Sequence, residues 1–285
     1  MRDGPALDSH VHSEWSWDAH EGSMERSCAE AVRIGLPAIA FTEHLDHTVW
    51  SVSPESQAQA GDPPPGITVD AEGRVLIPAF DFEGYLASVE RCRDLFPELR
   101  VLSGLEVGEP HWHVDAVDAV LRSGTFDRVL GSLHALPDGD ALYEPFDLHL
   151  RRPPSVVFGA YLAEITELVT GSDAFSVLAH IDYPLRYWGD AHRFDPHDFE
   201  DELRAALRAT AQTGRALEIN TVLPLDATIL RWWHDEGGTA VTFGSDAHEP
   251  ANVARGFAAA AAMAEACGFR PTSDLVDPWS RAFVG

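Results

Sequence analysis

The sequence predicts an α/β fold in which parallel strands close, or nearly close, into a barrel. Seven short apolar runs alternate with longer amphipathic segments from one end of the chain to the other. Each run is rich in Val, Ile, Leu or Phe, as expected of strands that are covered on both faces. Strands that alternate with helices in this way are joined by crossovers and lie parallel. The runs occupy residues 6–11, 36–41, 100–105, 128–133, 175–179, 216–219 and 240–243.

An open, doubly wound sheet is the alternative architecture. Such sheets commonly carry a glycine-rich phosphate loop of the Rossmann or Walker kind after a strand, and none of the seven runs is followed by one. A chain of 285 residues is within the size of α/β barrels that form one domain. Because the sequence shows no internal repeat, low-complexity tract or linker, we expect a single domain over residues 1–285.

Two stretches interrupt the alternation, at residues 51–78 and 136–154. Each follows the end of a predicted strand that carries a candidate metal ligand. Loops of this length in a compact domain are commonly active-site lids or disordered segments. We interpret both stretches as lid insertions.

The best-marked helix boundaries contain proline or glycine. The Asp-Pro pair at 195–196 supplies an N-cap and a first-turn proline for a helix over residues 198–213, and Gly214 ends that helix. The Glu-Pro pair at 249–250 is expected to open the last helix.

The composition excludes several classes of partner. A formal net charge of −26 argues against nucleic acid, because a nucleic-acid-binding surface needs a basic stripe to displace counterions from phosphates. No apolar stretch is long enough to span a bilayer, so no membrane partner is expected. Three cysteines without paired spacing favour a reducing compartment over a disulfide scaffold. We therefore expect a cytoplasmic enzyme.

Polar residues that end the apolar runs are the strongest functional signal. In a parallel barrel the carboxyl ends of all strands lie at one face, so side chains that are distant in sequence converge there. His10 and His12 are two residues apart, as are Asp246 and His248, so each pair shares one face of a strand. A single histidine after a strand is more often a structural group, but six at strand ends would require many coincidences. They are His10, His12, His44, His134, His180 and His248.

These histidines and the neighbouring carboxylates form a ligand set without thiolates, which suits Zn, Mn or Fe better than Ca. Six histidines and at least three carboxylates exceed the coordination of one cation, so two or three divalent metal ions are expected. Clustered cations can hold a bridging hydroxide as the nucleophile and neutralise phosphate oxygens. The set therefore predicts hydrolysis of a phosphate ester, and no Ser-His-Asp order or reactive cysteine offers a competing nucleophile.

At these residues the sequence resembles the PHP (polymerase and histidinol phosphatase) superfamily, and within it the monofunctional histidinol-phosphatase branch. The matching motifs include the HxH pair at 10–12, the TEH at 42–44 and the SDAH at 245–248. The matched segments together extend from Asp8 to about Phe269. The resemblance implies a distorted (β/α)7 TIM-like barrel with a trinuclear metal centre at its C-terminal face.

The resemblance also implies how the ligands divide among three metals. Those of the first metal are His10, His12, Glu106 and Asp246. Those of the second are Asp18, His44 and His248. Those of the third are Glu106, as a bridge, with His134 and His180. Asp246, like its family counterpart, would shuttle a proton to or from the bridging hydroxide, so Asp246 and Glu106 are the expected catalytic residues.

Three further residues are candidates for binding the substrate. Arg186 resembles the phosphate-gripping arginine of the branch, and a guanidinium fork suits a phosphate dianion; a surface salt bridge is the alternative. Ser132 could donate a hydrogen bond to the phosphate or be an ordinary strand-end hydroxyl. Glu43 could meet an ammonium group or hydrogen-bond a ligand histidine.

The expected activity is metal-dependent hydrolysis of a phosphomonoester, with L-histidinol phosphate as the best single substrate. A PHP-family phosphoesterase that acts on another small phosphate or nucleotide is the first alternative. A metal-binding domain without turnover is the second. The expected partner is a small phosphorylated metabolite, while Zn, Mn and Fe share this ligand set and the sequence indicates no oligomeric state.

Overall fold

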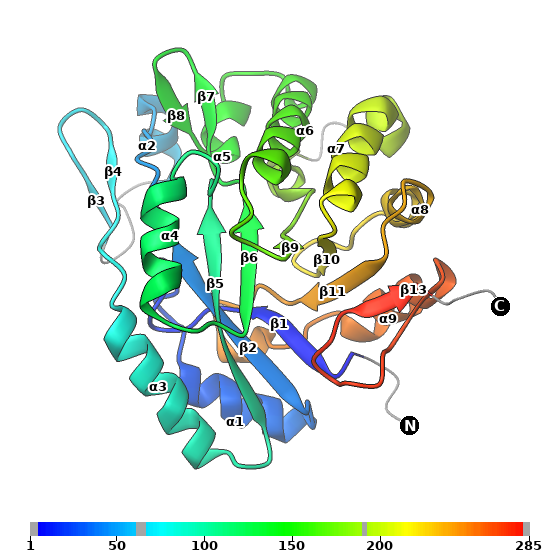
Figure 1. Ribbon diagram of the computed structural model, residues 1–285. Coiled ribbons are helices and arrows are strands. Elements are labelled where there is room, and N and C mark those ends of the chain that lie inside the picture. Colours follow the sequence, from blue (N-terminus) through cyan, green and yellow to red (C-terminus); the bar gives the residue numbers. More distant parts are fainter. Residues whose placement is uncertain (1–4, 61–66, 190–192, 282–285) are drawn as a thin grey trace.

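A curled nine-stranded sheet forms the centre of the molecule in the computed structural model, which describes residues 5–60, 67–189 and 193–281 (Figure 1). Neighbouring strands follow the order β1-β2-β5-β6-β9-β10-β11-β13-β12. The first seven pair in parallel and in chain order. They are β1 (Leu7–Val11), β2 (Ala38–Leu45), β5 (Arg100–Gly108), β6 (Arg128–Ser132), β9 (Val177–Leu178), β10 (Ala216–Asn220) and β11 (Ala240–Gly244).

Each of the seven predicted apolar runs overlaps one of these parallel strands, so the predicted α/β class is confirmed. β2 and β5 continue beyond their apolar runs and include the polar ligand candidates at their carboxyl ends. β9 is only two residues long, yet it pairs with both β6 and β10. The C-terminal strands β12 (Phe269–Arg270) and β13 (Trp279–Arg281), which were not predicted, extend the sheet in antiparallel fashion beyond β11.

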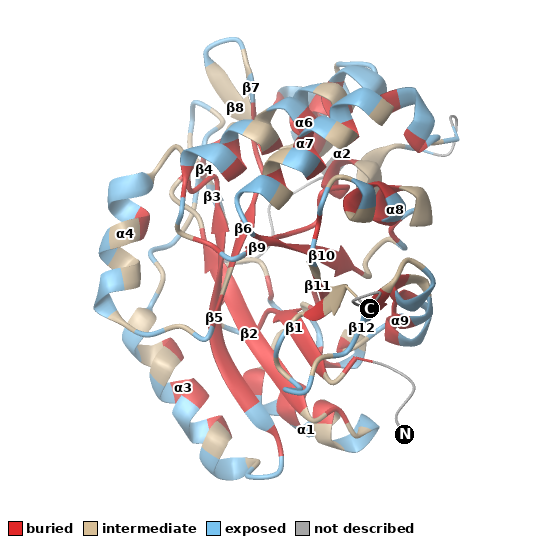
Figure 2. Ribbon diagram, turned by 45° about the vertical axis from the view of Figure 1, so that its right-hand side comes forward, coloured by how far each residue is buried: buried red, intermediate tan, exposed pale blue. Residues whose placement is uncertain are grey.

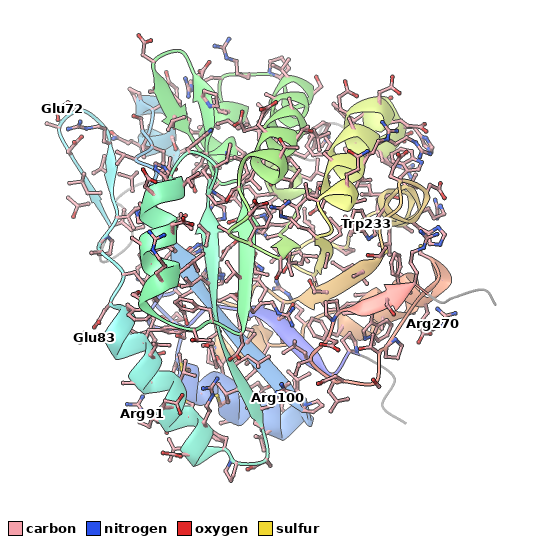
Figure 3. All side chains as sticks on the ribbon, viewed as in Figure 1. Glu72, Glu83, Arg91, Arg100, Trp233 and Arg270 are labelled. Carbon is pink, nitrogen blue, oxygen red and sulfur yellow. The ribbon has the colours of Figure 1, made fainter. Side chains whose placement is uncertain are left out.

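Helices cover the outer face of the sheet, and their exposed sides point to solvent while the strands are buried (Figure 2). Charged side chains such as Glu83, Arg91 and Arg270 lie on the outside of the molecule, whereas Trp233 is fully buried (Figure 3). The helices are α1 (Met24–Ile34), α2 (Pro54–Ala60), α3 (Phe82–Leu95), α4 (Val114–Ser123), α5 (Pro145–His149), α6 (Pro154–Gly171), α7 (Glu200–Gln212), α8 (Ala227–Asp235) and α9 (Phe257–Ala266).

The two predicted proline-marked helix starts have different outcomes. Asp195 does accept a capping hydrogen bond from His197, but a 3₁₀ turn, Pro196–Phe199, precedes α7. The expectation that the pair at 249–250 opens the last helix is wrong. Only a 3₁₀ turn, Pro250–Asn252, follows that pair. The backbone is left-handed soon afterwards, with φ angles of 55° at Ala254 and 75° at Gly256, so α9 can start only at Phe257.

The two insertions pack against each other above the carboxyl ends of the strands. The first contains α2 and the hairpin of β3 (Thr68–Val69) and β4 (Val75–Leu76); its residues 61–66 lie outside the described part of the chain. The second contains the hairpin of β7 (Leu136–Asp138) and β8 (Ala141–Tyr143), followed by α5. The backbone N–H of Ser51 donates to the carbonyl of Leu142 at 2.7 Å. The N–H of Ser53 donates to the carboxylate of Asp147 at 2.6 Å.

The first parallel strand meets the segment that follows the last one. Val11 forms an isolated parallel bridge with Ala247, and the N–H of His12 donates to the carbonyl of Ala247 at 2.9 Å. The carboxylate of Asp8 accepts hydrogen bonds from the backbone N–H groups of Ser245 at 2.9 Å and Ala254 at 2.7 Å. These contacts bring the two ends of the parallel strand series together at the carboxyl end.

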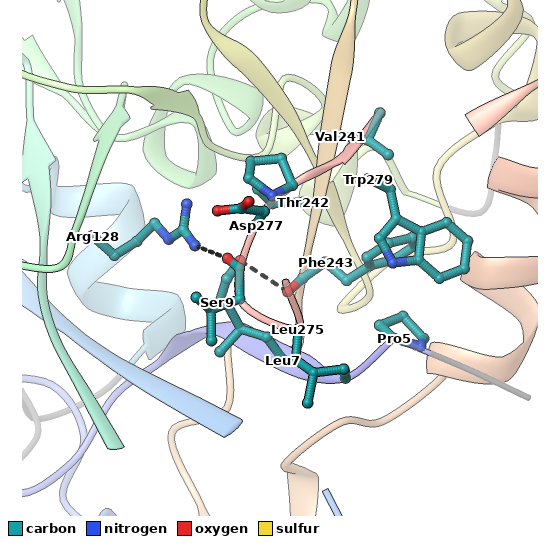
Figure 4. A pocket seen from close by; sticks show the side chains of 13 residues that line it. Pro5, Leu7, Ser9, Arg128, Val241, Thr242, Phe243, Leu275, Asp277 and Trp279 are labelled. Atoms are coloured by element: carbon teal, nitrogen blue, oxygen red, sulfur yellow. Dashed lines mark hydrogen bonds between the residues drawn. The ribbon is translucent and has the colours of Figure 1, made fainter. Parts of the chain in front are cut away.

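At the opposite end, the C-terminal segment covers the entry to the strands (Figure 4). The hydroxyl of Ser9 donates to the carbonyl of Phe243 at 3.0 Å, and Arg128 donates to the carbonyl of Val276 at 2.7 Å. The cavity beside them measures only about 20 Å³. That volume holds about one water molecule, so side chains fill the space beside Ser9 and Phe243.

Candidate metal centre

Seven of the nine predicted metal ligands line one cavity of about 140 Å³ at the carboxyl end of the parallel strands. The other two come from the end of β1, close to it. Strand register explains part of the convergence, because His44 of β2 pairs directly with Glu106 of β5. The seven that line the cavity are Asp18, His44, Glu106, His134, His180, Asp246 and His248.

The other two, His10 and His12, are fully buried and do not line the cavity.

The innermost group contains two imidazoles and two carboxylates. The Nε2 atoms of His10 and His12 are 3.0 Å apart. Glu106 Oε2 lies 3.2 Å from the first and 3.3 Å from the second, and Asp246 Oδ1 lies 3.6 Å and 3.3 Å from them. All four side chains are buried, so their polar atoms face one another without solvent between them.

Glu106 connects this group to two others. Its Oε1 atom lies 2.7 Å from His180 Nε2 and 3.3 Å from His134 Nε2, while its Oε2 atom lies 3.2 Å from His44 Nδ1. A single carboxylate therefore contacts histidines from several different strand ends. The resemblance implies a bridging role for Glu106, which stays a prediction, and a ligand in such a role has to lie between the other groups.

The outermost group lies around Asp18. Its Oδ2 atom is 3.1 Å from His248 Nε2 and 3.3 Å from His44 Nε2. The other oxygen, Oδ1, is buried and has no hydrogen-bond partner in the described part of the chain. Burying an oxygen without a partner is costly, and a cation at this position would remove the cost.

The chemistry of these groups fits divalent cations. Their nitrogen and oxygen atoms form sets of three that lie within 4.8 Å of one another, and no thiolate is among them. Three sets are made up of predicted ligands only: His12, His44 and His248; His10, His12 and Asp246; Glu106, His134 and His180. Imidazoles mixed with carboxylates are the donors that Zn, Mn and Fe accept.

The charge distribution favours cations as well. Burial alone would raise the pKa of Glu106, but the imidazoles of His10, His134 and His44 hold it well below its usual range. Burial alone would lower the pKa of His44, but the carboxylates of Asp18 and Glu106 raise it to about 10. The cluster therefore stabilises positive charge, which bound metals can supply in place of protons.

Hydrogen bonds on the far side of the imidazoles set their tautomers. His10 Nδ1 lies 2.7 Å from Glu218 Oε1. Because an ionised carboxylate can only accept, Nδ1 of His10 carries the proton, and the lone pair of Nε2 is left for a cation. Gly244 leaves room for this contact, since a Cβ atom at that position would lie 2.1 Å from Glu218 Oε1.

A similar relay acts on His12. The Ser16 hydroxyl donates to Glu43 at 2.6 Å, so it accepts from His12 Nδ1, which lies 2.9 Å away. Glu43 also accepts two hydrogen bonds from Ser13. It is fully buried and does not line the cavity, so the structure places it behind a ligand candidate rather than beside a substrate.

The other two predicted substrate-binding residues lie in different places. Arg186 lines the cavity, and its guanidinium donates to Asp246 at 2.5 Å and to Asn220 at 3.3 Å. It is therefore not a surface salt bridge. Ser132 is fully buried and donates to the carbonyl of Val107 at 3.3 Å, so it does not reach the cavity.

The sequence reasoning missed Glu218 and Asp46. Asp46 Oδ2 accepts from Trp17 Nε1 at 2.9 Å, and Asp46 Oδ1 lies 3.4 Å from His134 Nδ1. A signal for both was present, because side chains two residues apart in a strand share a face. Asp46 follows His44 by two residues, and Glu218 is a lone acid inside an apolar run.

We expect Glu218→Gln to weaken metal retention or activity by about 10- to 100-fold, as is typical when a carboxylate that orients a ligand histidine is lost. The amide can present its N–H₂ to His10 and so favour the wrong tautomer. Metal content after dialysis against a graded chelator series measures the effect. Glu202→Gln, on an exposed position of α7, is the matched control, and equal retention in both variants would contradict the role of Glu218.

The chain is similar to known proteins over most of its length. A PHP domain family model matches residues 8–222. The histidinol-phosphatase of Lactococcus lactis subsp. lactis is 26% identical over 255 residues, which cover 85% of this chain and 84% of that protein. The probable histidinol-phosphatase of Thermotoga maritima is 28% identical over 257 residues, covering 88% of this chain and 87% of that protein.

Solved structures show the same fold. A crystal structure of histidinol phosphate phosphatase from Lactococcus lactis, complexed with Zn, L-histidinol and phosphate, matches with a TM-score of 0.74 at 23% identity and covers 93% of this chain and 94% of that one. The putative histidinol phosphatase of Listeria monocytogenes matches with a TM-score of 0.67 at 16% identity, over 89% of this chain and 99% of that one. Among the described helices, none is long and apolar enough to cross a membrane.

Proposed function

This chain belongs to the PHP domain family, and we propose that it is a metal-dependent phosphomonoesterase whose substrate is L-histidinol phosphate. The observation that carries the proposal is the convergence of nine histidine and carboxylate side chains beside an arginine at one cavity. The names of the relatives support the choice of substrate. A single domain over residues 1–285, with the parallel strands as a distorted (β/α)7 barrel and the two insertions as lids, is part of the same proposal.

We assign the ligands to three metals as the resemblance to the PHP superfamily implies. His10, His12, Glu106 and Asp246 would hold the first metal. Asp18, His44 and His248 would hold the second, and Glu106, His134 and His180 the third. The contacts within each of these groups support the division, and the Zn in the Lactococcus lactis structure makes Zn the first choice of metal.

The chain's own residues then divide the work of hydrolysis. When bound, the cations would supply an activated water and neutralise the phosphate oxygens. Arg186 binds a phosphate oxygen through its guanidinium, which suits an oxyanion. Asp246 accepts or returns a proton at its carboxylate. Glu218 and Glu43 keep His10 and, through Ser16, His12 in the orientation and tautomer that the site needs.

The test is to purify the full chain, count metals per chain and measure phosphate release from a panel of esters. The panel contains L-histidinol phosphate, a nucleoside monophosphate, a sugar phosphate and p-nitrophenyl phosphate. We expect two or three metals and the highest kcat/KM with L-histidinol phosphate. Preferential turnover of another ester would refute the assignment of L-histidinol phosphate as the substrate. Fewer than two metals per chain together with no turnover would refute the proposed enzymatic activity. The cytoplasmic location stays a prediction from the sequence.

Arg186→Ala is expected to raise KM and to weaken inhibition by inorganic phosphate roughly 10- to 100-fold, the loss of a hydrogen bond to a charged group. Arg186 lines the cavity, so its removal takes away a cationic donor that can reach a bound phosphate. The inhibition constant of inorganic phosphate, measured by steady-state kinetics, reports it directly. Arg208→Ala, on the exposed side of α7, serves as the control, and an unchanged constant for Arg186→Ala would remove Arg186 from phosphate binding.

A further inference from the structure

Glu144 is the carboxylate of the cavity that the proposed chemistry leaves unused. It lines the same cavity as the metal-ligand candidates and Arg186. The other carboxylates there are engaged: Asp18 contacts two histidines, Glu106 contacts several, and Asp246 accepts from Arg186. The side chain of Glu144 forms no hydrogen bond or ion pair with any residue that the structure describes, and only its backbone carbonyl accepts one, from the N–H of Leu148.

The position of Glu144 in the chain makes this lack of a partner informative. It is the N-cap residue of α5, where a carboxylate commonly accepts a hydrogen bond from the first turn. Its side chain makes no such bond. The carboxylate lies in the cavity without a hydrogen-bond partner from the protein, which is costly for a polar group shielded from water. A ligand that enters the cavity would supply that partner.

The surroundings of Glu144 favour a cationic partner. Burial raises the pKa of Glu144 to about 7, and the carboxylates of Asp18, Asp46 and Glu109 act in the same direction against the nearby His134. A positively charged group beside it would relieve both the burial and the repulsion. Tyr187 lines the same cavity, and an aromatic ring face attracts cations.

We propose that Glu144 binds the ammonium group of the substrate and so selects phosphate esters of amino alcohols. The cavity then has two recognition elements of opposite charge: Arg186 and the metal positions for the phosphate, and Glu144 for the amine. Glu144 lies in the insertion at 136–154, so this insertion would determine substrate specificity in addition to acting as a lid. The inference rests on the proposed function and names the feature of the substrate that the site reads.

Glu144→Gln tests the inference, because it keeps the size of the side chain and removes its charge. The two substrates are L-histidinol phosphate and 3-(imidazol-4-yl)propyl phosphate, the same ester without the amino group. Assays at about pH 8 keep the imidazole neutral, since its ordinary pKa is about 6.5. We expect the kcat/KM ratio of the aminated to the deaminated ester to fall roughly 10- to 100-fold, mainly through KM.

Asp140→Asn is the matched control, since it removes one negative charge from an exposed position in the same insertion. An unchanged ratio in Glu144→Gln would overturn the inference. Loss of a metal ion together with equal losses for both esters would also overturn it, because Glu144 would then be a metal ligand.

Binding of the product alcohol separates this inference from the proposed function. Calorimetric titration of the metal-loaded protein with L-histidinol should show weaker binding to Glu144→Gln than to the wild type. If the wild type hydrolyses neither ester, the proposed function fails, and the titration still decides the role of Glu144. Equal affinity of both proteins for L-histidinol would refute that role whatever the activity.

Discussion

Glu106→Gln is expected to lower kcat by more than about 100-fold and to release metal from the protein. Loss of a group that only orients a metal ligand typically costs about 10- to 100-fold, and Glu106 is itself a candidate ligand. Glu106 contacts His10, His12 and His44 through one oxygen and His134 and His180 through the other. The amide keeps the shape of the side chain but replaces one acceptor with a donor and removes the charge that can hold two cations together.

Metal analysis and steady-state kinetics on the same preparation measure the outcome. Glu98→Gln is the control, because Glu98 is exposed and lies just before β5. Near-normal turnover with full metal content in Glu106→Gln would refute the central role of this carboxylate. Loss of metal without loss of turnover would show that the lost metal is not needed for hydrolysis.

Asp246→Asn is expected to lower kcat by roughly 10²- to 10⁴-fold, the usual contribution of a positioned proton donor or acceptor. Asp246 has a φ angle of 50°, in the left-handed region that asparagine adopts more readily than most residues. The substitution therefore spares the backbone and removes the charge that lies beside His12 and Arg186.

Thermal unfolding and kcat separate the two kinds of effect for this variant. We expect the melting temperature of the metal-free protein to change little while turnover is lost. Asp198→Asn, at an exposed position, controls for a general effect of charge. Turnover within a few-fold of the wild type would show that Asp246 does not take part in the proton transfer.

The strand ends could be predicted because the alternation of apolar runs with helical segments fixes both the strands and their direction. Apolar runs separated by helical segments identify parallel strands, and the carboxyl ends of parallel strands meet at one edge. His134 and His180 could therefore be placed beside Glu106 although they are separated from it along the chain. The same argument would have found Asp46 and Glu218, had the alternation of side chains been followed one step further along β2 and within β10.

The insertions could not be predicted to the same depth. Their short strands and the five-residue helix α5 contain too few residues for a hydrophobic period to be read, so the direction of any one side chain is undetermined by pattern. Glu144 shows the consequence, since its place in the cavity depends on the tertiary contacts that position α5. The predicted start of α9 was wrong for a related reason. Pro250 suggested a helix, but Ala254 and Gly256 have left-handed backbone conformations that interrupt it.

The meeting of the first strand with the segment after the last one has a consequence for the newly synthesised chain. The candidate ligands begin at His10 and end at His248, so the set is incomplete until synthesis has passed His248. Bringing these two ends together closes a very long loop, and contacts so distant in sequence tend to form late in folding. A chain that ends before His248 would therefore lack the complete site, and hydrolysis would begin only after β1 has met the segment that follows β11.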